Sequence, residues 1–139
     1  MGMTAKEFLC NVSWSRKDLT CTEDLSLREI DEIFALADIF KAEVKKDRTK
    51  LPYLKGKTVV NLFFEPSTRT RTAFEMAAHK LGADVISFSS SISSSVKGET
   101  LKDTARNIEA LMADMIIVRH SSSGAAKYLA DRVDIPVIN

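Results

Sequence analysis

Residues 63–72 read Phe-Phe-Glu-Pro-Ser-Thr-Arg-Thr-Arg-Thr. An apolar run, residues 58–64, leads into Pro66, and a helical pattern of apolar residues follows. This order predicts a buried strand that passes into a helix through small hydroxyl residues. The first backbone N–H groups of such a helix have no intrahelical acceptor, and the helix dipole adds partial positive charge there. The stretch therefore predicts an anion site at the junction.

Two guanidinium groups, those of Arg69 and Arg71, fall in the first turn of the predicted helix. The helix dipole slightly disfavours cations at this position, so their presence favours a role in holding an anion. A guanidinium bonds two oxygens of a phosphate at once. We expect Arg69 to face the anion, and Arg71, two positions on, to form a structural ion pair. Glu65 reads as a catalytic acid or, preferably, as a structural carboxylate that pairs with a nearby arginine.

Strand-like and helix-like patterns alternate along the rest of the chain. The apolar spacing predicts helices over residues 26–46, 68–81 and 123–132, another helix that starts at Gly98 or Thr100, and strands over residues 58–64, 84–88, 115–118 and 135–138. Ser26 and Glu29 form a capping box at the first of these helices, and residues 1–24 are expected to be irregular. The alternation implies an α/β fold with a parallel sheet and helices on both faces, and 139 residues suffice for a single three-layer domain.

Ligands of such sheets bind outside the carboxyl ends of the strands. Three segments follow predicted strands and should share this rim: residues 67–71, a serine-rich loop with Lys97, and Arg119 with His120. The serine-rich residues 87–95 read either as a flexible linker or as a lid whose Lys97 brings a point charge to a phosphate, and both readings stay open. Arg119 is favoured as a site residue, and His120 as a turn residue.

Composition excludes several other classes of function. A net charge of +1 gives no argument for nucleic acid or a membrane surface as partner, and no apolar run is long enough to span a bilayer. The first residues lack a signal-peptide core, so cytoplasm is the expected location. Cys10 and Cys21 have no zinc spacing and are expected to be plain, buried or semi-exposed thiols, with no metal site. Neither Gly-x-Gly-x-x-Gly nor Gly-x4-Gly-Lys occurs, which disfavours a nucleotide-binding loop.

At these motifs the sequence resembles the carbamoyltransferase family. The family signature stands intact over residues 64–71, and Phe74-Glu75 follows it. The likeness runs in matching order from about Leu25 to Asn139. Three features favour the aspartate carbamoyltransferases over the ornithine enzymes: Pro66 before Ser67, Lys97-Gly98-Glu99-Thr100 with Asp103-Thr104, and Val118-Arg119-His120.

The resemblance implies the carbamoyl phosphate-binding part of a transferase. Such an enzyme moves the carbamoyl group from carbamoyl phosphate to the amine of L-aspartate, giving N-carbamoyl-L-aspartate and phosphate for pyrimidine biosynthesis, without metal or organic cofactor. By resemblance, the phosphate is held by Ser67, Thr68, Arg69 and Thr70. Arg69 would also offset charge on the leaving oxygen, and Thr70 and Arg119 would contact carbamoyl or phosphate oxygens. These contributions are positioning and electrostatic stabilisation.

The resemblance also implies partners. The family segment that matches the serine-rich loop enters the neighbouring subunit's site with a Ser and a Lys, which implies a homotrimer. Lys97 matches the Lys, and Ser94 or Ser95 matches the Ser, with the choice within the 93–95 run left open. Whether a regulatory or dihydroorotase partner joins the assembly is also left open.

Residues 1–139 are interpreted as the N-terminal, carbamoyl phosphate-binding half of a two-domain catalytic chain. The family's aspartate-binding domain and its His-Pro-x-x-Gln segment have no counterpart in them. This half is expected to bind carbamoyl phosphate but to be inactive alone. Two alternatives remain: a fragment like ornithine carbamoyltransferase, or a non-catalytic phosphate-binding or assembly module.

Overall fold

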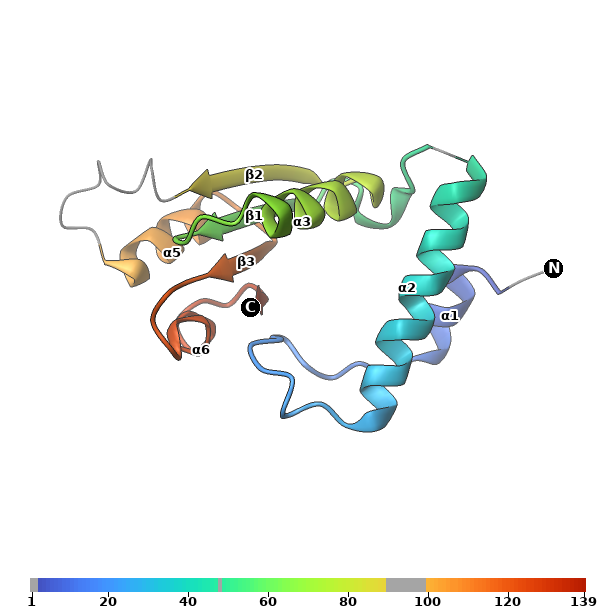
Figure 1. Cartoon of the computed structure of the whole chain (residues 1–139), viewed down its shortest axis with the longest axis horizontal. Coiled ribbons are helices and arrows are strands. Elements are labelled where there is room, and N and C mark those ends of the chain that lie inside the picture. The colour runs from blue at the N-terminus through green and yellow to red at the C-terminus, as the bar shows by residue number, and fades with distance from the viewer. Residues whose placement is uncertain (1–2, 48, 90–99) are drawn as a thin grey trace.

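Four parallel strands form a sheet (Figure 1). The computed structural model describes residues 3–47, 49–89 and 100–139. The strands stand in the order β2-β1-β3-β4, and they are β1 (Thr58–Phe63), β2 (Asp84–Ser89), β3 (Met115–Arg119) and β4 (Val137–Ile138). Since every pairing is parallel, the carboxyl ends of the four strands lie at one edge of the sheet.

Helices cover both faces of this sheet. One face carries α3 (Thr68–Lys80), and the other carries α5 (Leu101–Ala110) and α6 (Ala125–Ala130). On β1, Val60 and Leu62 join the apolar cluster that includes α5 and α6. Val59 and Phe63 join the cluster that includes Ala78 of α3. The predicted α/β fold is therefore confirmed, and burial on both faces explains why β1 is a continuous apolar run.

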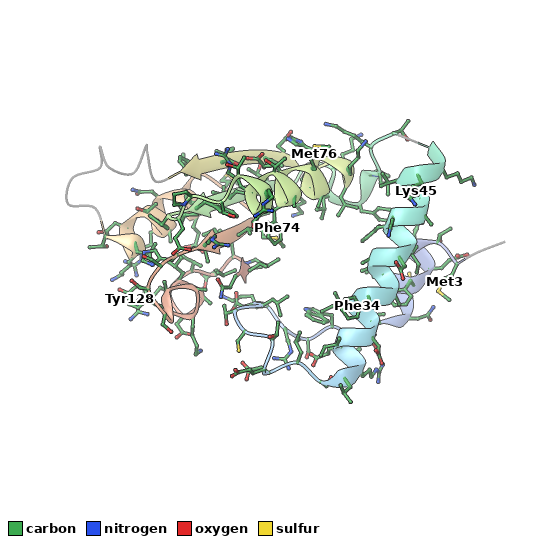
Figure 2. The ribbon with its side chains drawn as sticks, viewed as in Figure 1. Met3, Phe34, Lys45, Phe74, Met76 and Tyr128 are labelled. Carbon is green, nitrogen blue, oxygen red and sulfur yellow. The ribbon has the colours of Figure 1, made fainter. Side chains whose placement is uncertain are left out.

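Two further helices, α1 (Ala5–Asn11) and α2 (Leu27–Asp47), pack against each other beside the sheet (Figure 1). Phe34 projects from α2 on the side that faces the sheet, and it is 65% exposed (Figure 2). An apolar groove of about 430 Å³ lies between the two parts, lined in part by Trp14, Ile33, Met115 and Ile138. No helix in the described residues is both long and apolar enough to cross a membrane.

The prediction that residues 1–24 are irregular is wrong over α1. Thr4 caps this helix, because its hydroxyl accepts from the Glu7 N–H at 3.3 Å and its own N–H donates to the Glu7 carboxylate at 2.8 Å. Seven residues are too few to show apolar periodicity, so only the capping box signals the helix. The capping box predicted for α2 is confirmed, since the Ser26 N–H donates to the Glu29 carboxylate at 2.8 Å and the Ser26 hydroxyl accepts from the Glu29 N–H at 3.2 Å.

An extended arm returns from α1 to the sheet and pairs with β4. The Leu19 N–H donates to the Val137 carbonyl at 2.9 Å, and the Asn139 N–H donates to the Leu19 carbonyl at 3.0 Å. The ammonium group of Lys17 donates at 3.0 Å to the carbonyl of Ala130, the last residue of α6, and at 2.6 Å to that of Val133, just after the helix. The arm therefore covers the outer edge of β4 and ties the α1–α2 pair to the sheet.

Element boundaries differ from the predicted ones at the C-terminal side. The helix predicted over residues 123–132 forms only over Ala125–Ala130, after Gly124 with a φ of +78°. The strand predicted over residues 135–138 is reduced to Val137–Ile138, because Pro136 has no N–H to donate to the neighbouring strand. Of the two starts considered for α5, Thr100 is the cap, since its hydroxyl accepts from the Asp103 N–H at 3.2 Å. A single 3-10 turn, η1 (Pro52–Leu54), interrupts the connection from α2 to β1.

Candidate functional site

The junction of β1 and α3 has an open helix N-terminus. Ser67 is the N-cap residue of α3, with φ −154° and ψ 76°, and its side chain makes no capping hydrogen bond. The first turn of α3 contains no acidic residue. A helix of 13 residues has a developed dipole, so its first N–H groups and its positive end are available to an anion.

The structure places four of the predicted phosphate ligands on this junction. Ser67 and Thr70 are half-buried, and Thr68 and Arg69 are exposed. Within the described ranges, no side chain forms an ion pair or hydrogen bond with the Arg69 guanidinium. Hydroxyls, helix N–H groups and a free guanidinium thus meet where β1 ends.

Arg119 lies at the same edge of the sheet. It is the last residue of β3 and the register partner of Phe63, and its carbonyl accepts from the Phe64 N–H at 2.8 Å. Its Nε donates to Oε2 of Glu65 at 3.1 Å. The predicted pairing of Glu65 with a nearby arginine is therefore confirmed. Because the two side chains are 46% and 36% exposed, the pair orients the guanidinium more than it stabilises the fold.

His120 shapes the turn that follows β3. Its Nδ1 accepts from the Ser122 N–H at 2.9 Å, and its ring packs edge-on against Phe64 with 4.9 Å between centroids. An accepting Nδ1 leaves the proton of the neutral ring on Nε2. A polar cavity of about 470 Å³ lies beside the ring, lined by residues 121–124 and Asn139 among others. This geometry agrees with the turn role that the sequence favours for His120.

Arg71 points away from the junction and pairs with Glu75 one turn on. The Arg71 Nε lies 3.6 Å from Glu75 Oε1, and the Ser87 hydroxyl on β2 donates to the same oxygen at 2.5 Å. The predicted structural ion pair of Arg71 is confirmed. With Arg71 held by Glu75 and Arg119 held by Glu65, Arg69 is the unpaired cation among the arginines of the described rim.

Sequence reasoning missed the role of Glu75 as the partner of Arg71. The i, i+4 spacing of Arg71 and Glu75 in a predicted helix could have revealed it. The contact of Glu75 with Ser87 depends on how α3 packs against β2, which a sequence does not state.

Ser94, Ser95 and Lys97 lie outside the described residues. Within the residues that are described, no cluster of His, Cys, Asp and Glu can hold a metal ion. Cys10 and Cys21 are free thiols, but the expectation that they are buried or semi-exposed is wrong, since both side chains are exposed.

Comparison with known proteins identifies the family. Residues 17–139 match the model for the aspartate/ornithine carbamoyltransferase, carbamoyl-P binding domain. The aspartate carbamoyltransferase catalytic subunit of Opitutus terrae is 57% identical over 126 residues, which cover 91% of this chain and 40% of the relative. That of Campylobacter fetus is 56% identical over 132 residues, covering 92% of this chain and 41% of the relative.

Solved structures give the same relationship. The catalytic subunit of the M. jannaschii aspartate transcarbamoylase superposes with a TM-score of 0.83 at 42% identity, over 89% of this chain and 40% of that one. The aspartate transcarbamoylase from Trypanosoma cruzi in complex with carbamoyl phosphate superposes with a TM-score of 0.80 at 32% identity, over 88% and 38%. The chain thus spans about 40% of the length of the relatives it matches. It belongs to the aspartate/ornithine carbamoyltransferase family and comprises the carbamoyl-P binding domain.

Proposed function

We propose that this chain binds carbamoyl phosphate at the junction of β1 and α3 and presents it for transfer to the amine of L-aspartate. The observation that carries the proposal is the uncapped N-terminus of α3 with the unpaired guanidinium of Arg69 beside it. The aspartate carbamoyltransferases among its relatives, and the T. cruzi enzyme in complex with carbamoyl phosphate, support the choice of substrate.

Each residue of the junction has a separate task in this proposal. The hydroxyls of Ser67, Thr68 and Thr70, with the first N–H groups of α3, hold the phosphate oxygens. The amine attacks the carbonyl carbon, the bond from that carbon to the bridging oxygen breaks, and the electron pair leaves with phosphate while the amine loses a proton. Arg69 offsets the charge that grows on the leaving oxygen, a contribution for which one well-placed donor is typically worth about 10²–10³ in rate.

Arg119 holds the other end of the substrate. Its Nε is occupied by Glu65, so the two terminal nitrogens of the guanidinium remain to donate to a carbamoyl or phosphate oxygen. The carboxylate fixes the plane of the guanidinium before substrate arrives, which lowers the cost of ordering it on binding.

The proposal extends to the rest of the enzyme. Aspartate would bind to a second domain that residues 1–139 do not include, so this chain alone should bind without turnover. Lys97 and Ser94 or Ser95 would enter the site of a neighbouring subunit in a homotrimer. The setting would be pyrimidine biosynthesis in the cytoplasm.

Calorimetric titration of the 139-residue chain with carbamoyl phosphate tests the proposal. We expect saturable heat for the unsubstituted chain and a loss of affinity of at least about tenfold in Arg69→Ala. Arg28→Ala is the matched control, because it also removes one arginine, on α2, where Arg28 pairs with Glu32. Equal affinities of all three proteins, or no heat from the unsubstituted chain, would contradict the proposal.

A further inference from the structure

A buried polar side chain lies beneath α3 in the middle of the apolar sheet. Asn61 of β1 has no exposed surface and is the one polar residue among the fully buried side chains that the described ranges contain. Strand alternation places it on the face of Val59 and Phe63, toward α3. Its Oδ1 has no hydrogen-bond partner within the described structure. Burying such an amide lowers stability unless its groups are satisfied, so its presence calls for an explanation.

The amide of Asn61 supports a ladder of polar contacts that reaches Arg71 in the first turn of α3. Asn61 Nδ2 donates to the hydroxyl of Ser87, its register partner on β2, at 3.4 Å. That hydroxyl donates to Glu75 Oε1 at 2.5 Å, and Glu75 Oε1 lies 3.6 Å from the Arg71 Nε. Since Asn61 donates to the Ser87 oxygen, the Ser87 proton is directed to Glu75. The ladder therefore links β1 and β2 to the first turn of α3.

We propose that Glu75 is a positioning residue for the phosphate site. Its bond to Ser87 fixes α3 against β2, and its ion pair with Arg71 holds the first turn of the helix and keeps the second guanidinium away from the anion. This inference rests on the proposed function. Arg69 and Arg71 differ by about 200° around the helix, so one can face the phosphate only while the other is held on the opposite side.

Stability alone does not account for this arrangement. Buried polar and ionic groups are often no more stabilising than apolar side chains of similar volume, so Asn61 and Ser87 are poor choices for a core. Without Glu75, Arg71 would be an unpaired cation at the positive end of the α3 dipole, which disfavours it. The ladder gives Arg71 a partner and a fixed direction, which apolar residues cannot do.

Two substitutions of equal shape test the ladder. Ser87→Val and Ser87→Thr differ only by a methyl group in place of the hydroxyl, and neither changes the charge. Inorganic phosphate is titrated into the 139-residue chain and followed by calorimetry, with the melting temperature of each variant as the measure of folding. We expect Ser87→Val to weaken phosphate binding about tenfold and Ser87→Thr to retain the affinity to within about twofold.

Glu75→Gln separates positioning from simple electrostatics. Loss of a negative charge near the junction should tighten phosphate binding if charge alone matters, whereas loss of positioning should weaken it. If Glu75 acts through Arg71, the losses caused by Glu75→Gln and Arg71→Gln should not add. The double variant should then bind phosphate no more weakly than the weaker-binding of the two single variants. Glu75→Gln decides the question by itself if Ser87→Val does not fold.

The outcomes distinguish this inference from the proposed function. Phosphate affinity unchanged in a folded Ser87→Val, or raised in Glu75→Gln, overturns the positioning role and leaves the phosphate site intact. Additive losses in the double variant, with a lowered melting temperature, indicate a merely structural role and overturn it as well. Failure of the unsubstituted chain to bind phosphate overturns both.

Discussion

The guanidinium of Arg119 donates to the carboxylate of Glu65 across 3.1 Å, and the two residues stand at the ends of different strands. Arg119 closes β3, and Glu65 follows β1. The parallel register brings them together, because Phe63 pairs with Arg119 across the two strands. The bond spans the rim of the sheet and aims one guanidinium before any substrate is bound.

Replacing Glu65 by Gln should blunt the discrimination between carbamoyl phosphate and phosphate. The neutral amide holds Arg119 less firmly, so the end of the site assigned to the carbamoyl group loses order. We expect the ratio of the two affinities, measured by calorimetry, to fall about threefold to tenfold while phosphate affinity changes less. Glu32→Gln makes the same change on α2, where Glu32 pairs with Arg28 at 2.9 Å, and should leave the ratio unaltered. An unchanged ratio in Glu65→Gln would argue against an orienting role.

Acid should loosen the start of α2 through Glu29. A hydrogen bond from Arg16, then bonds from Ser26, lower the pKa of the Glu29 carboxyl from 4.5 to about 2. A pKa depressed in the folded state contributes stability that is present above the unfolded value and is lost as pH falls from about 4.5 toward about 2. Melting temperatures measured over this window should therefore fall more steeply for the unsubstituted chain than for Glu29→Gln. Parallel curves would show that this carboxylate is not coupled to folding.

Gly82 should tolerate no side chain. Its φ is +91°, and a Cβ there would lie 2.6 Å from the Leu51 carbonyl oxygen. Gly82→Ala should lower the free energy of unfolding by about 2–3 kcal/mol or more, since it adds a clash with backbone to the left-handed conformation. Gly56→Ala is the control, because Gly56 has a φ of +77° with no atom within 4 Å of the added Cβ, and it should cost only about 1 kcal/mol. Urea unfolding of both variants checks the difference, and equal losses would mean that the clash is relieved by a shift of the loop.

Lys17 should contribute more to the stability of the fold than its partly exposed position suggests. Its ammonium group donates to two carbonyls at the C-terminal end of α6, at 3.0 and 2.6 Å, and so fastens the N-terminal arm. Lys17→Met should lower the free energy of unfolding by about 1 kcal/mol, allowing for partial exposure of the group. Lys127→Met removes an exposed i, i+4 partner of Asp131 on α6 and should change it by less than about 0.5 kcal/mol. Indistinguishable unfolding curves for the two variants would contradict the prediction.

The central strand and the helix after it were predictable because local signals agree there. The β-branched Val59 and Val60 in an apolar run, the break at Pro66 and the positive φ of Gly82 all act within a few residues of the chain. Contacts between distant segments were harder to predict from the sequence. Sequence reasoning expected an arginine partner for Glu65, but only the β1–β3 register identifies it as Arg119.

The polar ladder was not predictable for the same reason. Asn61 and Ser87 are 26 residues apart, and they meet only because β2 lies beside β1 in one particular register. At the other extreme, α1 was missed because its seven residues offer no second apolar turn, although Thr4 and Glu7 mark its start. Local chemistry thus indicated the proposed phosphate junction, while strand pairing decides which side chains support it.

The pairing of the arm with β4 has a consequence for shortened forms of the chain. Leu19 occupies the position of a neighbouring strand, and without it the N–H of Asn139 and the carbonyl of Val137 would be left open to solvent. Bare edges of this kind recruit strands from other molecules. Trimming the first twenty or so residues would therefore be expected to make the shortened chain associate with other copies edge to edge.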